Sequence, residues 1–420
     1  MTVDLVVVGL GYVGLPLAKE AVASGLNVLG FDAYGSVVDG LNNGRSHVDD
    51  LSDSDIATMQ SKGFRATSNV EDIRGADAAV ICVPTPLSAE GGPDLAAVIA
   101  ATETIAEALA PGMLVVLEST TYPGTTEDIV KPILERGGLR AGTDFHLAFS
   151  PERIDPGNAQ FGMRNTPKVV GGIDPASTDR AADLYARFVD TVVRASGTRE
   201  AETSKLLENT YRHVNIALMN EMSKFCHDLG IDLWDVIKLA KTKPFGFQAF
   251  YPGPGVGGHC IPIDPNYLSH RVKSELGYSF RFVELAQEIN MAMPAYIVQR
   301  SQDLLNDEGK ALKGSKVLLL GVTYKPDIAD QRESPARPLG VALLAKGADL
   351  SFHDPYVESW AIDGGSMTRV ADLDQAIAQA DLVIFVQNHD AYDAEAYANA
   401  AALFFDTRGV TNPDGASHRL

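Results

Sequence analysis

Cys260 lies in the glycine- and proline-rich stretch GPGVGGHCIPID at residues 253–264. A structural cysteine would have few side chains to pack against there. Glycines let a ligand approach the backbone, and prolines fix the turn. The stretch therefore predicts a thiol that faces a ligand and can act as a nucleophile. His259 beside it suggests a cysteine protease, but adjacent side chains usually diverge, and no Asn or oxyanion signature accompanies the pair.

Lys205 and Asn209 lie four residues apart in a segment predicted to be helical, so they share one face of the helix. A lysine and an amide that point the same way can hold and neutralise an oxyanion. Spacing alone favours a plainer interpretation, a solvated lysine beside a surface asparagine. Only the other motifs of the chain favour the oxyanion-binding role.

The motif GLGYVG places glycines at Gly9, Gly11 and Gly14 between a predicted strand and a predicted helix, with Asp32 after the next strand. In a dinucleotide-binding fold, such glycines permit the tight turn, the approach of the pyrophosphate and close helix packing. The acid would accept hydrogen bonds from the ribose hydroxyls and repel a 2′-phosphate, which favours NAD over NADP. The alternatives are a glycine turn without a ligand and a solvated acid. A protease would leave this motif unexplained.

The chain of 420 residues is long enough for two or three domains of roughly 100 to 200 residues. Its 55 acidic and 35 basic residues give a formal net charge of -20, which disfavours binding to nucleic acid. An anionic substrate would therefore need locally placed cations. Glycine or proline interrupts the apolar runs well short of the roughly 20 residues of a membrane helix. We expect an unprocessed cytoplasmic protein that binds neither nucleic acid nor membrane.

The cysteines Cys82, Cys226 and Cys260 lie far apart and show neither CxxC nor His-rich spacing. This predicts neither disulfides nor a metal site and fits a reducing cytoplasm. Cys82 and Cys226 fall within apolar segments and are expected to be small core residues.

The apolar patterns divide the chain into three segments. Runs such as DAAVICVPTP and MLVVLEST end in polar residues, as strands of a parallel sheet do at the edge where ligands bind. From residue 200 to 300 the apolar spacing is close to 3.6, which predicts helices. A long helix here could form a subunit interface, although an internal core is the plainer explanation. From residue 313 the strand pattern returns without GxGxxG. The predicted fold class is α/β, with two doubly wound Rossmann-like domains around a helical middle.

The motifs GLGYVGLPLA, VPTP, EST, YPGTT, SPER, ETSKLLEN, GVGGHCIPID, GVTYKPDIADQRESP and FFDTRG occur in this order over essentially the whole chain. The sequence thereby resembles the UDP-glucose/GDP-mannose dehydrogenase family. The resemblance implies an NAD-binding domain at residues 1–200, a helical dimerisation and active-site domain at 201–300, and a UDP-sugar-binding domain at 301–420. It also implies a long central helix that forms a homodimer, or a dimer of dimers. The activity implied is oxidation of a nucleotide sugar at C6 to the uronic acid with two NAD and no metal.

The resemblance assigns the chemistry to a set of residues. It makes Cys260 the nucleophile, with Lys205, Asn209 and Asp264 around C6, and it places Thr120 and Glu152 near the catalytic water and the nicotinamide. The implied cofactor contacts are Gly9, Gly11, Tyr12, Val13, Gly14, Asp32, Thr85, Thr120 and Arg332. The implied substrate contacts are Glu152, Arg153, Lys205, Asn209, Phe250, Tyr251, Gly257, Lys325 and Arg408. Of these, Lys325 and Arg408 are the cations expected at the UDP end.

One departure from the family pattern bears on the sugar. Members that act on UDP-glucose often have a lysine just before the aspartate that corresponds to Asp264, whereas Ile263 occupies that position here. The stretch TKPFGFQAFYPGPGVGGHCIPIDP is more similar to the branch that oxidises UDP-N-acetylhexosamines. We therefore expect a UDP-N-acetylglucosamine 6-dehydrogenase, with UDP-glucose and UDP-N-acetylmannosamine as the alternative substrates.

The reaction itself explains the thiol. Conversion of an alcohol to a carboxylate removes four electrons, whereas each NAD accepts one hydride. Addition of Cys260 to the aldehyde would give a thiohemiacetal that can be oxidised again, and water would hydrolyse the resulting thioester. Asp264, or a water held by Thr120 and Glu152, would supply base catalysis.

Two other functions remain as alternatives. A two-electron dehydrogenase of the 3-hydroxyacid type shares a Rossmann domain and a helical Lys-x-x-x-Asn, but it would not need Cys260 or the third domain. A non-catalytic regulator that binds NAD or a nucleotide sugar would gain nothing from a nucleophile.

Overall fold

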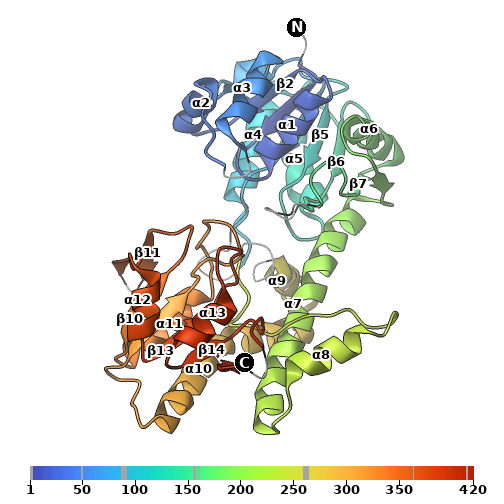
Figure 1. Ribbon diagram of the computed structural model, residues 1–420. Coiled ribbons are helices and arrows are strands. Elements are labelled where there is room, and N and C mark those ends of the chain that lie inside the picture. Colours follow the sequence, from blue (N-terminus) through green and yellow to red (C-terminus); the bar gives the residue numbers. More distant parts are fainter. Residues whose placement is uncertain are drawn as a thin grey trace. The chain divides into compact units, whose positions relative to one another are not determined.

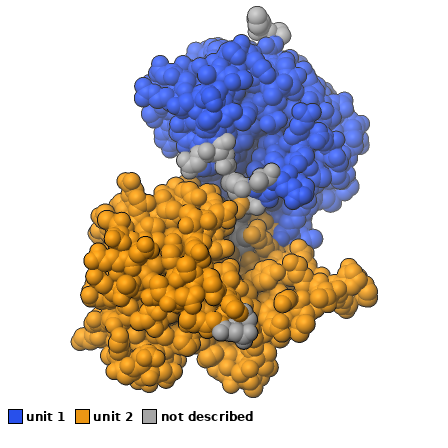
Figure 2. Space-filling view, viewed as in Figure 1, with its two compact units in different colours: residues 1–208, 266–278 blue, residues 209–265, 279–420 orange. Residues whose placement is uncertain are grey.

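The computed structural model describes residues 3–48, 51–86, 92–154, 158, 160–258, 264–362, 364–412 and 415–420. The chain divides into two compact units, which Figure 2 colours separately. The first unit comprises residues 1–208 and 266–278, and the second comprises residues 209–265 and 279–420. The division into three domains stays a prediction.

An eight-stranded sheet forms the centre of the first unit, in the order β3-β2-β1-β4-β5-β6-β7-β8. Its strands are β1 (Leu5–Val8), β2 (Val28–Phe31), β3 (Arg65–Thr67), β4 (Ala78–Ile81), β5 (Leu114–Leu117), β6 (His146–Phe149), β7 (Lys168–Gly172) and β8 (Val192–Arg194). The neighbours pair in parallel, apart from β6 and β7, which are antiparallel. The order β3-β2-β1-β4-β5-β6 is that of a Rossmann fold, and its switch point lies between β1 and β4.

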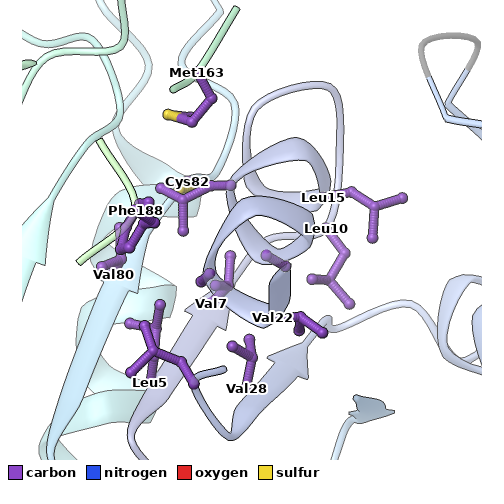
Figure 3. Close-up of a cluster of buried hydrophobic side chains, with 14 of the residues drawn as sticks. Leu5, Val7, Leu10, Leu15, Val22, Val28, Val80, Cys82, Met163 and Phe188 are labelled. Atoms are coloured by element: carbon purple, nitrogen blue, oxygen red, sulfur yellow. The ribbon is translucent and has the colours of Figure 1, made fainter. Parts of the chain in front are cut away.

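Helices cover this sheet (Figure 1). They are α1 (Gly14–Ala23), α2 (Gly35–Asn42), α3 (Asp53–Ser61), α4 (Ala96–Ala108), α5 (Lys131–Leu134) and α6 (Pro175–Tyr185), with short turns at η1 (Val70–Ile73), η2 (Thr126–Val130) and η3 (Glu135–Gly137). The first unit also contains most of α9 (Asp264–Leu276). Continuous apolar strands such as LVVV bury both faces, so Leu5 and Val7 belong to one core cluster and Val6 and Val8 to another. Figure 3 shows the cluster that contains Leu5 and Val7, together with Cys82.

The second unit contains a parallel five-stranded sheet in the order β10-β9-β13-β14-β15. Its strands are β9 (Lys316–Leu320), β10 (Asp349–His353), β13 (Leu382–Phe385), β14 (Phe404–Asp406) and β15 (Ser417–Arg419), beside a hairpin of β11 (Ser359–Ile362) and β12 (Gly365–Thr368). Its helices are α8 (Leu233–Lys241), α10 (Arg281–Asp307), α11 (Ala336–Ala345), α12 (Leu373–Gln379) and α13 (Ala394–Ala400). When the five strands of this sheet are renumbered 1 to 5 in chain order, starting from β9, their order across the sheet is 2-1-3-4-5. This order is also that of a doubly wound fold.

Helix α7 (Thr198–Asp228) runs for 31 residues and belongs in part to each unit. Together with the two doubly wound sheets, it confirms the predicted fold class. None of the described helices is long and apolar enough to cross a membrane.

Candidate active site

The GLGYVG turn joins β1 to α1 with a different requirement at each glycine. Gly9 has φ +93°, and a Cβ there would lie 2.8 Å from the carbonyl oxygen of Cys82. A Cβ on Gly14 would collide with the carbonyl oxygen of Gly9. No atom of the described residues lies within 4 Å of a Cβ placed on Gly11. Two of the glycines are therefore needed for packing, while the third leaves open space for a ligand to approach the backbone.

Asp32 follows β2 and lies beside this turn. Its carboxylate accepts hydrogen bonds from the backbone N–H groups of Leu10 and Tyr34, both at 3.0 Å. In the part of the chain that the structure describes, no side chain caps the N-terminus of α1 at Val13, which leaves the positive end of that helix available to an anion. The open space at Gly11, the uncapped helix and the fixed acid fit a dinucleotide whose pyrophosphate meets the helix and whose ribose meets Asp32.

The segments that follow β4 and β5 carry Thr85 and Thr120, and hydrogen bonds hold both segments. The Ser119 hydroxyl donates to the carbonyl oxygen of Val83 at 2.7 Å, which ties the two segments together. The hydroxyl of the fully buried Tyr267, on α9, donates to the carbonyl oxygen of Thr85. Both threonines are half-buried at the carboxyl edge of the sheet, where ligands of such folds bind.

A buried group of charged side chains lies at the same edge. Lys168 is 3% exposed and contacts the fully buried carboxylate of Glu118, and its Nζ atom lies 3.4 Å from Oε2 of Glu152. The Tyr185 hydroxyl donates to Glu118 at 3.1 Å, and the Cys82 thiol lies 3.7 Å from the same carboxylate oxygen. Sequence reasoning found Glu152 but missed Glu118, Lys168 and Tyr185.

Burial changes the acidity of these groups. It raises the pKa of Glu152, against the opposing effects of the backbone N–H of Ile154 and the nearby ammonium of Lys205. It lowers the pKa of Lys168 and raises the pKa of Cys82 and Tyr185. The raised pKa keeps the Cys82 thiol protonated at neutral pH, so Cys82 is a poor nucleophile.

In the second unit, the amide nitrogen of Asn209 donates to the Asp264 carboxylate at 2.5 Å. Asp264 is 3% exposed and is the first residue of α9. Asn220, about three turns further along α7, accepts a hydrogen bond from the backbone N–H of Gly253 at 2.9 Å. Helix α7 thus binds both ends of the stretch that contains Cys260. Cys260 itself, with His259 and Ile263, lies outside the described residues.

Comparison with known families decides the identity of the fold. Residues 3–189 match the NAD binding domain of the UDP-glucose/GDP-mannose dehydrogenase family, residues 199–292 its central domain and residues 318–413 its UDP binding domain. The chain belongs to the UDP-glucose/GDP-mannose dehydrogenase family. It is accordingly an NAD-dependent nucleotide-sugar dehydrogenase, as the sequence motifs predicted.

Known dehydrogenases of this family resemble the chain over nearly its full length. UDP-N-acetyl-D-mannosamine dehydrogenase of Methanococcus maripaludis strain C7 is 34% identical over 392 residues, which cover 92% of this chain and 86% of the relative. The solved structure of UDP-D-ManNAc dehydrogenase from Pyrococcus horikoshii has a TM-score of 0.88 and 32% identity, and the match covers 99% of this chain and 98% of that one. NDP-N-acetyl-D-galactosaminuronic acid dehydrogenase from Methanosarcina mazei Go1 has a TM-score of 0.84 and 32% identity, with coverage of 100% and 95%.

The predicted site residues of this dehydrogenase fall in both units. The first unit holds Gly9, Gly11, Tyr12, Val13, Gly14, Asp32, Thr85, Thr120, Glu152, Arg153 and Lys205. The second holds Asn209, Phe250, Tyr251, Gly257, Asp264, Lys325, Arg332 and Arg408.

Arg153 contacts α7, and Lys205 lies on that helix, both in the first unit. The Arg153 guanidinium donates to Glu208 at 2.7 and 3.3 Å and to the carbonyl oxygen of Pro167 at 2.7 Å. These bonds hold the segment after Glu152 against the helix. Lys205, one turn before Asn209, is only 8% exposed.

Arg408 lies at the carboxyl edge of the second sheet of the dehydrogenase, where neighbouring backbone groups fix its guanidinium. Its Nε donates to the carbonyl oxygen of Val386 at 2.6 Å, and a Cβ on Gly253 would lie 3.2 Å from its Nη1. Burial lowers the pKa of Arg408, which Asp406 partly offsets, yet the guanidinium stays charged at neutral pH. The arginine is thus a fixed cation at the edge where this fold class binds nucleotides.

The aromatic and glycine residues predicted for the substrate site also have defined contacts. The Phe250 ring meets Tyr211 edge-on at 5.6 Å, and the Tyr251 ring stacks on Trp234 at 6.0 Å. A Cβ on Gly257 would lie 2.7 Å from the carbonyl oxygen of Glu333, so the stretch before Cys260 packs closely on the loop after β9. That loop carries Lys325 and Arg332, and Asp330 binds the Arg332 guanidinium at 2.8 and 2.9 Å.

Proposed function

We propose that the protein oxidises the C6 hydroxyl of UDP-N-acetyl-D-mannosamine to the uronic acid, using two NAD per sugar. The observation that carries the reaction class is the 2.5 Å hydrogen bond from the Asn209 amide to the Asp264 carboxylate. Asp264 is buried and lies four residues after Cys260 in the sequence, so this bond fixes an amide and a carboxylate at the stretch that contains the proposed nucleophile. The sugar differs from the UDP-N-acetylglucosamine expected from the sequence, and the difference is the configuration at C2.

The relatives support this choice of sugar. Two of them are named for N-acetylmannosamine and one for an N-acetylgalactosaminuronic acid, so all three names specify an N-acetylated sugar. This agrees with the absence of a lysine at Ile263, which disfavours UDP-glucose. The chain shares about one third of its residues with the two N-acetylmannosamine enzymes over nearly its whole length, and we therefore propose UDP-N-acetylmannosamine as the substrate. UDP-N-acetylglucosamine is the alternative substrate to be tested.

The chain's own residues have distinct tasks in this reaction. Bound NAD would supply a hydride acceptor for each oxidation. The Cys260 thiolate would add to the aldehyde carbon to give a thiohemiacetal, and the second oxidation leaves a thioester that water cleaves to the acid and the free thiol. Lys205 and Asn209 would stabilise the oxyanions, with Asp264 holding the Asn209 amide in place. Thr120 and Glu152 would orient and deprotonate the water.

The remaining predicted residues bind the two nucleotides. The glycine turn, Tyr12, Val13, Asp32 and Thr85 would bind NAD, and Arg332 would complete that site. Arg408 and Lys325 would meet the diphosphate and uridine of the sugar nucleotide, because these cations provide positive charge that an acidic chain otherwise lacks. Arg153, Phe250, Tyr251 and Gly257 would border the sugar.

We also propose that the dehydrogenase is a homodimer formed through α7. Tyr211, Leu218, Phe225 and Leu229 recur along this helix, and each is between 45% and 69% exposed. The sequence made an internal core the plainer explanation for these apolar residues, but the described part of the chain leaves each of them at least 45% exposed, even where Phe250 packs against Tyr211. A second copy of the same helix would bury this stripe, since such a stripe packs well against itself.

A substrate panel tests the proposed function. NADH formation is followed with NAD and UDP-N-acetylmannosamine, UDP-N-acetylglucosamine, UDP-glucose or GDP-mannose, and the acid product is quantified. We expect the highest kcat/KM with UDP-N-acetylmannosamine and two NADH per acid formed. A preference for UDP-N-acetylglucosamine would restore the original expectation. One NADH per sugar, with an aldehyde as the product, would refute the four-electron reaction.

A further inference from the structure

The topology of the first sheet explains why Glu118, Glu152 and Lys168 meet. Cys82, Glu118 and Glu152 follow the parallel strands β4, β5 and β6, so all three lie at one edge of the sheet. Because β7 runs antiparallel to β6, its first residue, Lys168, lies at that same edge. One ammonium is thereby enclosed between two carboxylates beneath the segments that carry Thr85 and Thr120.

The two carboxylates have different surroundings. Lys168 forms an ion pair with Glu118, and the Tyr185 hydroxyl and the Cys82 thiol donate to the other carboxylate oxygen, which suits an ionised carboxylate. Glu152 has one oxygen bound by the backbone N–H groups of Arg153 and Ile154, and its other oxygen faces Lys168 at 3.4 Å. Glu118 and Lys168 balance each other's charge, so Glu152 adds a further negative charge to a buried cluster.

We propose that Lys168 is a positioning residue that orients Glu152 and, together with Glu118, sets the pH at which Glu152 becomes a base. This inference rests on the proposed function, in which Glu152 deprotonates the water that cleaves the thioester. Lys168 favours the ionised form of Glu152, and Glu118 opposes it in two ways, as a like charge and as a competitor for the ammonium. Burial raises the pKa of Glu152, and a change in the charge of either neighbour shifts that pKa further up or down.

Among the described residues, the titratable groups around Glu152 come from several elements that pack near it. They are Cys82 after β4, Glu118 after β5, Lys168 on β7, Tyr185 at the end of α6 and Lys205 on α7. Cys82 and Tyr185 have raised pKa values and stay neutral over the working range. Lys205 acts directly on the proposed oxyanion, which leaves Lys168 and Glu118 as the pair whose substitution changes Glu152 without removing a substrate contact.

The signs of the expected pH shifts follow from this arrangement. Activity requires ionised Glu152 and is lost as the pH falls through its pKa. Lys168→Met removes an opposite charge, so the pKa of Glu152 rises and the acidic limb of the kcat profile moves to higher pH. Glu118→Gln removes a like charge and releases the ammonium toward Glu152, so the limb moves to lower pH. Lys168→Arg keeps the charge and should leave the limb close to its original position.

The experiment measures acid formation against pH for the wild type, Lys168→Met, Lys168→Arg and Glu118→Gln at saturating sugar nucleotide and NAD, with NAD binding and thermal unfolding recorded for each. We expect an upward shift of about 1 to 3 pH units for Lys168→Met and a downward shift for Glu118→Gln, since opposite and like charges at this distance have effects of that size. If Lys168→Met does not fold, the direction of the shift in Glu118→Gln decides.

The inference is overturned if the wild type is active and the acidic limbs of the Lys168→Met and Glu118→Gln profiles do not shift, or shift in the same direction. The proposed function would then remain intact. A wild type that forms no acid from any UDP-sugar would instead refute the proposed function itself.

Discussion

The amide nitrogen of Asn209 lies 2.5 Å from the carboxylate of Asp264, although 55 residues separate them in the chain. The contact joins α7 to the start of α9, directly after the stretch that contains Cys260. A carboxylate that accepts from the amide nitrogen fixes which way the amide points. We infer that Asp264 binds one N–H of the Asn209 amide and thereby orients the second N–H toward the oxyanion.

Asn209→Ala should lower kcat on the order of a hundredfold or more, because one oxyanion donor is lost. Binding of both nucleotides should change little. Steady-state kinetics, with NAD binding by calorimetry, provides the measurement. Asn215→Ala is the matched control on the same helix, since the Asn215 amide donates only to the Tyr211 carbonyl at 2.7 Å in the described structure. Equal effects of the two substitutions would argue against an oxyanion role.

Asp32 should decide the choice of cofactor. In the wild type we expect turnover with NAD to exceed turnover with NADP by a wide margin, because in the proposed site the carboxylate would bind the ribose hydroxyls and repel a 2′-phosphate. Asp32→Ala should narrow that margin, chiefly through a higher KM for NAD. Comparable kcat/KM values for the two cofactors in the unaltered protein would be incompatible with this role.

The glycine turn offers a test that separates packing from ligand binding. Gly11→Ala enters open space, so its free energy of unfolding should stay within about 0.5 kcal/mol of the wild type while NAD affinity falls about tenfold. Gly14→Ala meets the carbonyl oxygen of Gly9 and should cost about 1 to 3 kcal/mol of stability. Denaturant unfolding and NAD titration measure the two quantities. The assignment fails if Gly11→Ala binds NAD normally.

The α7 stripe predicts the oligomeric state. Light scattering of the wild type should give twice the mass of one chain, and Leu218→Glu should give a monomer, because a charge would be buried in the interface. Leu276→Glu is the control, since Leu276 is also exposed but lies on α9 in the first unit. A monomeric wild type, or a dimer that survives Leu218→Glu, would show that α7 is not the interface.

Local patterns sufficed to predict the glycine turn, the long helix and buried strands such as β1, β4 and β5, but not the short strands such as β3 and β8. The strand LVVV, the turn GLGYVG and the acid Asp32 lie within about 30 residues of one another, so their positions in a dinucleotide-binding fold could be predicted from their spacing. The roles of Asn209 and Asp264 came only from the family resemblance. Their contact depends on where α9 begins relative to α7, which no local pattern encodes.

The buried charges could not be predicted in the same way. Lys168 begins the strand segment KVVGG, and a charged residue at the end of a strand usually faces solvent. Its burial follows from the antiparallel pairing of β7 with β6, a feature of the sheet as a whole. Glu118, directly after the apolar LVVL of β5, carried the only local signal, a charge at the carboxyl edge of a buried strand.

The central claim is that Cys260 carries the sugar covalently between the two oxidations, and product analysis of Cys260→Ala tests it most directly. The variant is mixed with NAD and the preferred UDP-sugar, and the quenched mixture is assayed for uronic acid by mass spectrometry, with ligand binding as the check on folding. We predict intact binding of both ligands and loss of the step from aldehyde to acid. Uronic acid formed at the wild-type rate, with two NADH per sugar, would contradict the account.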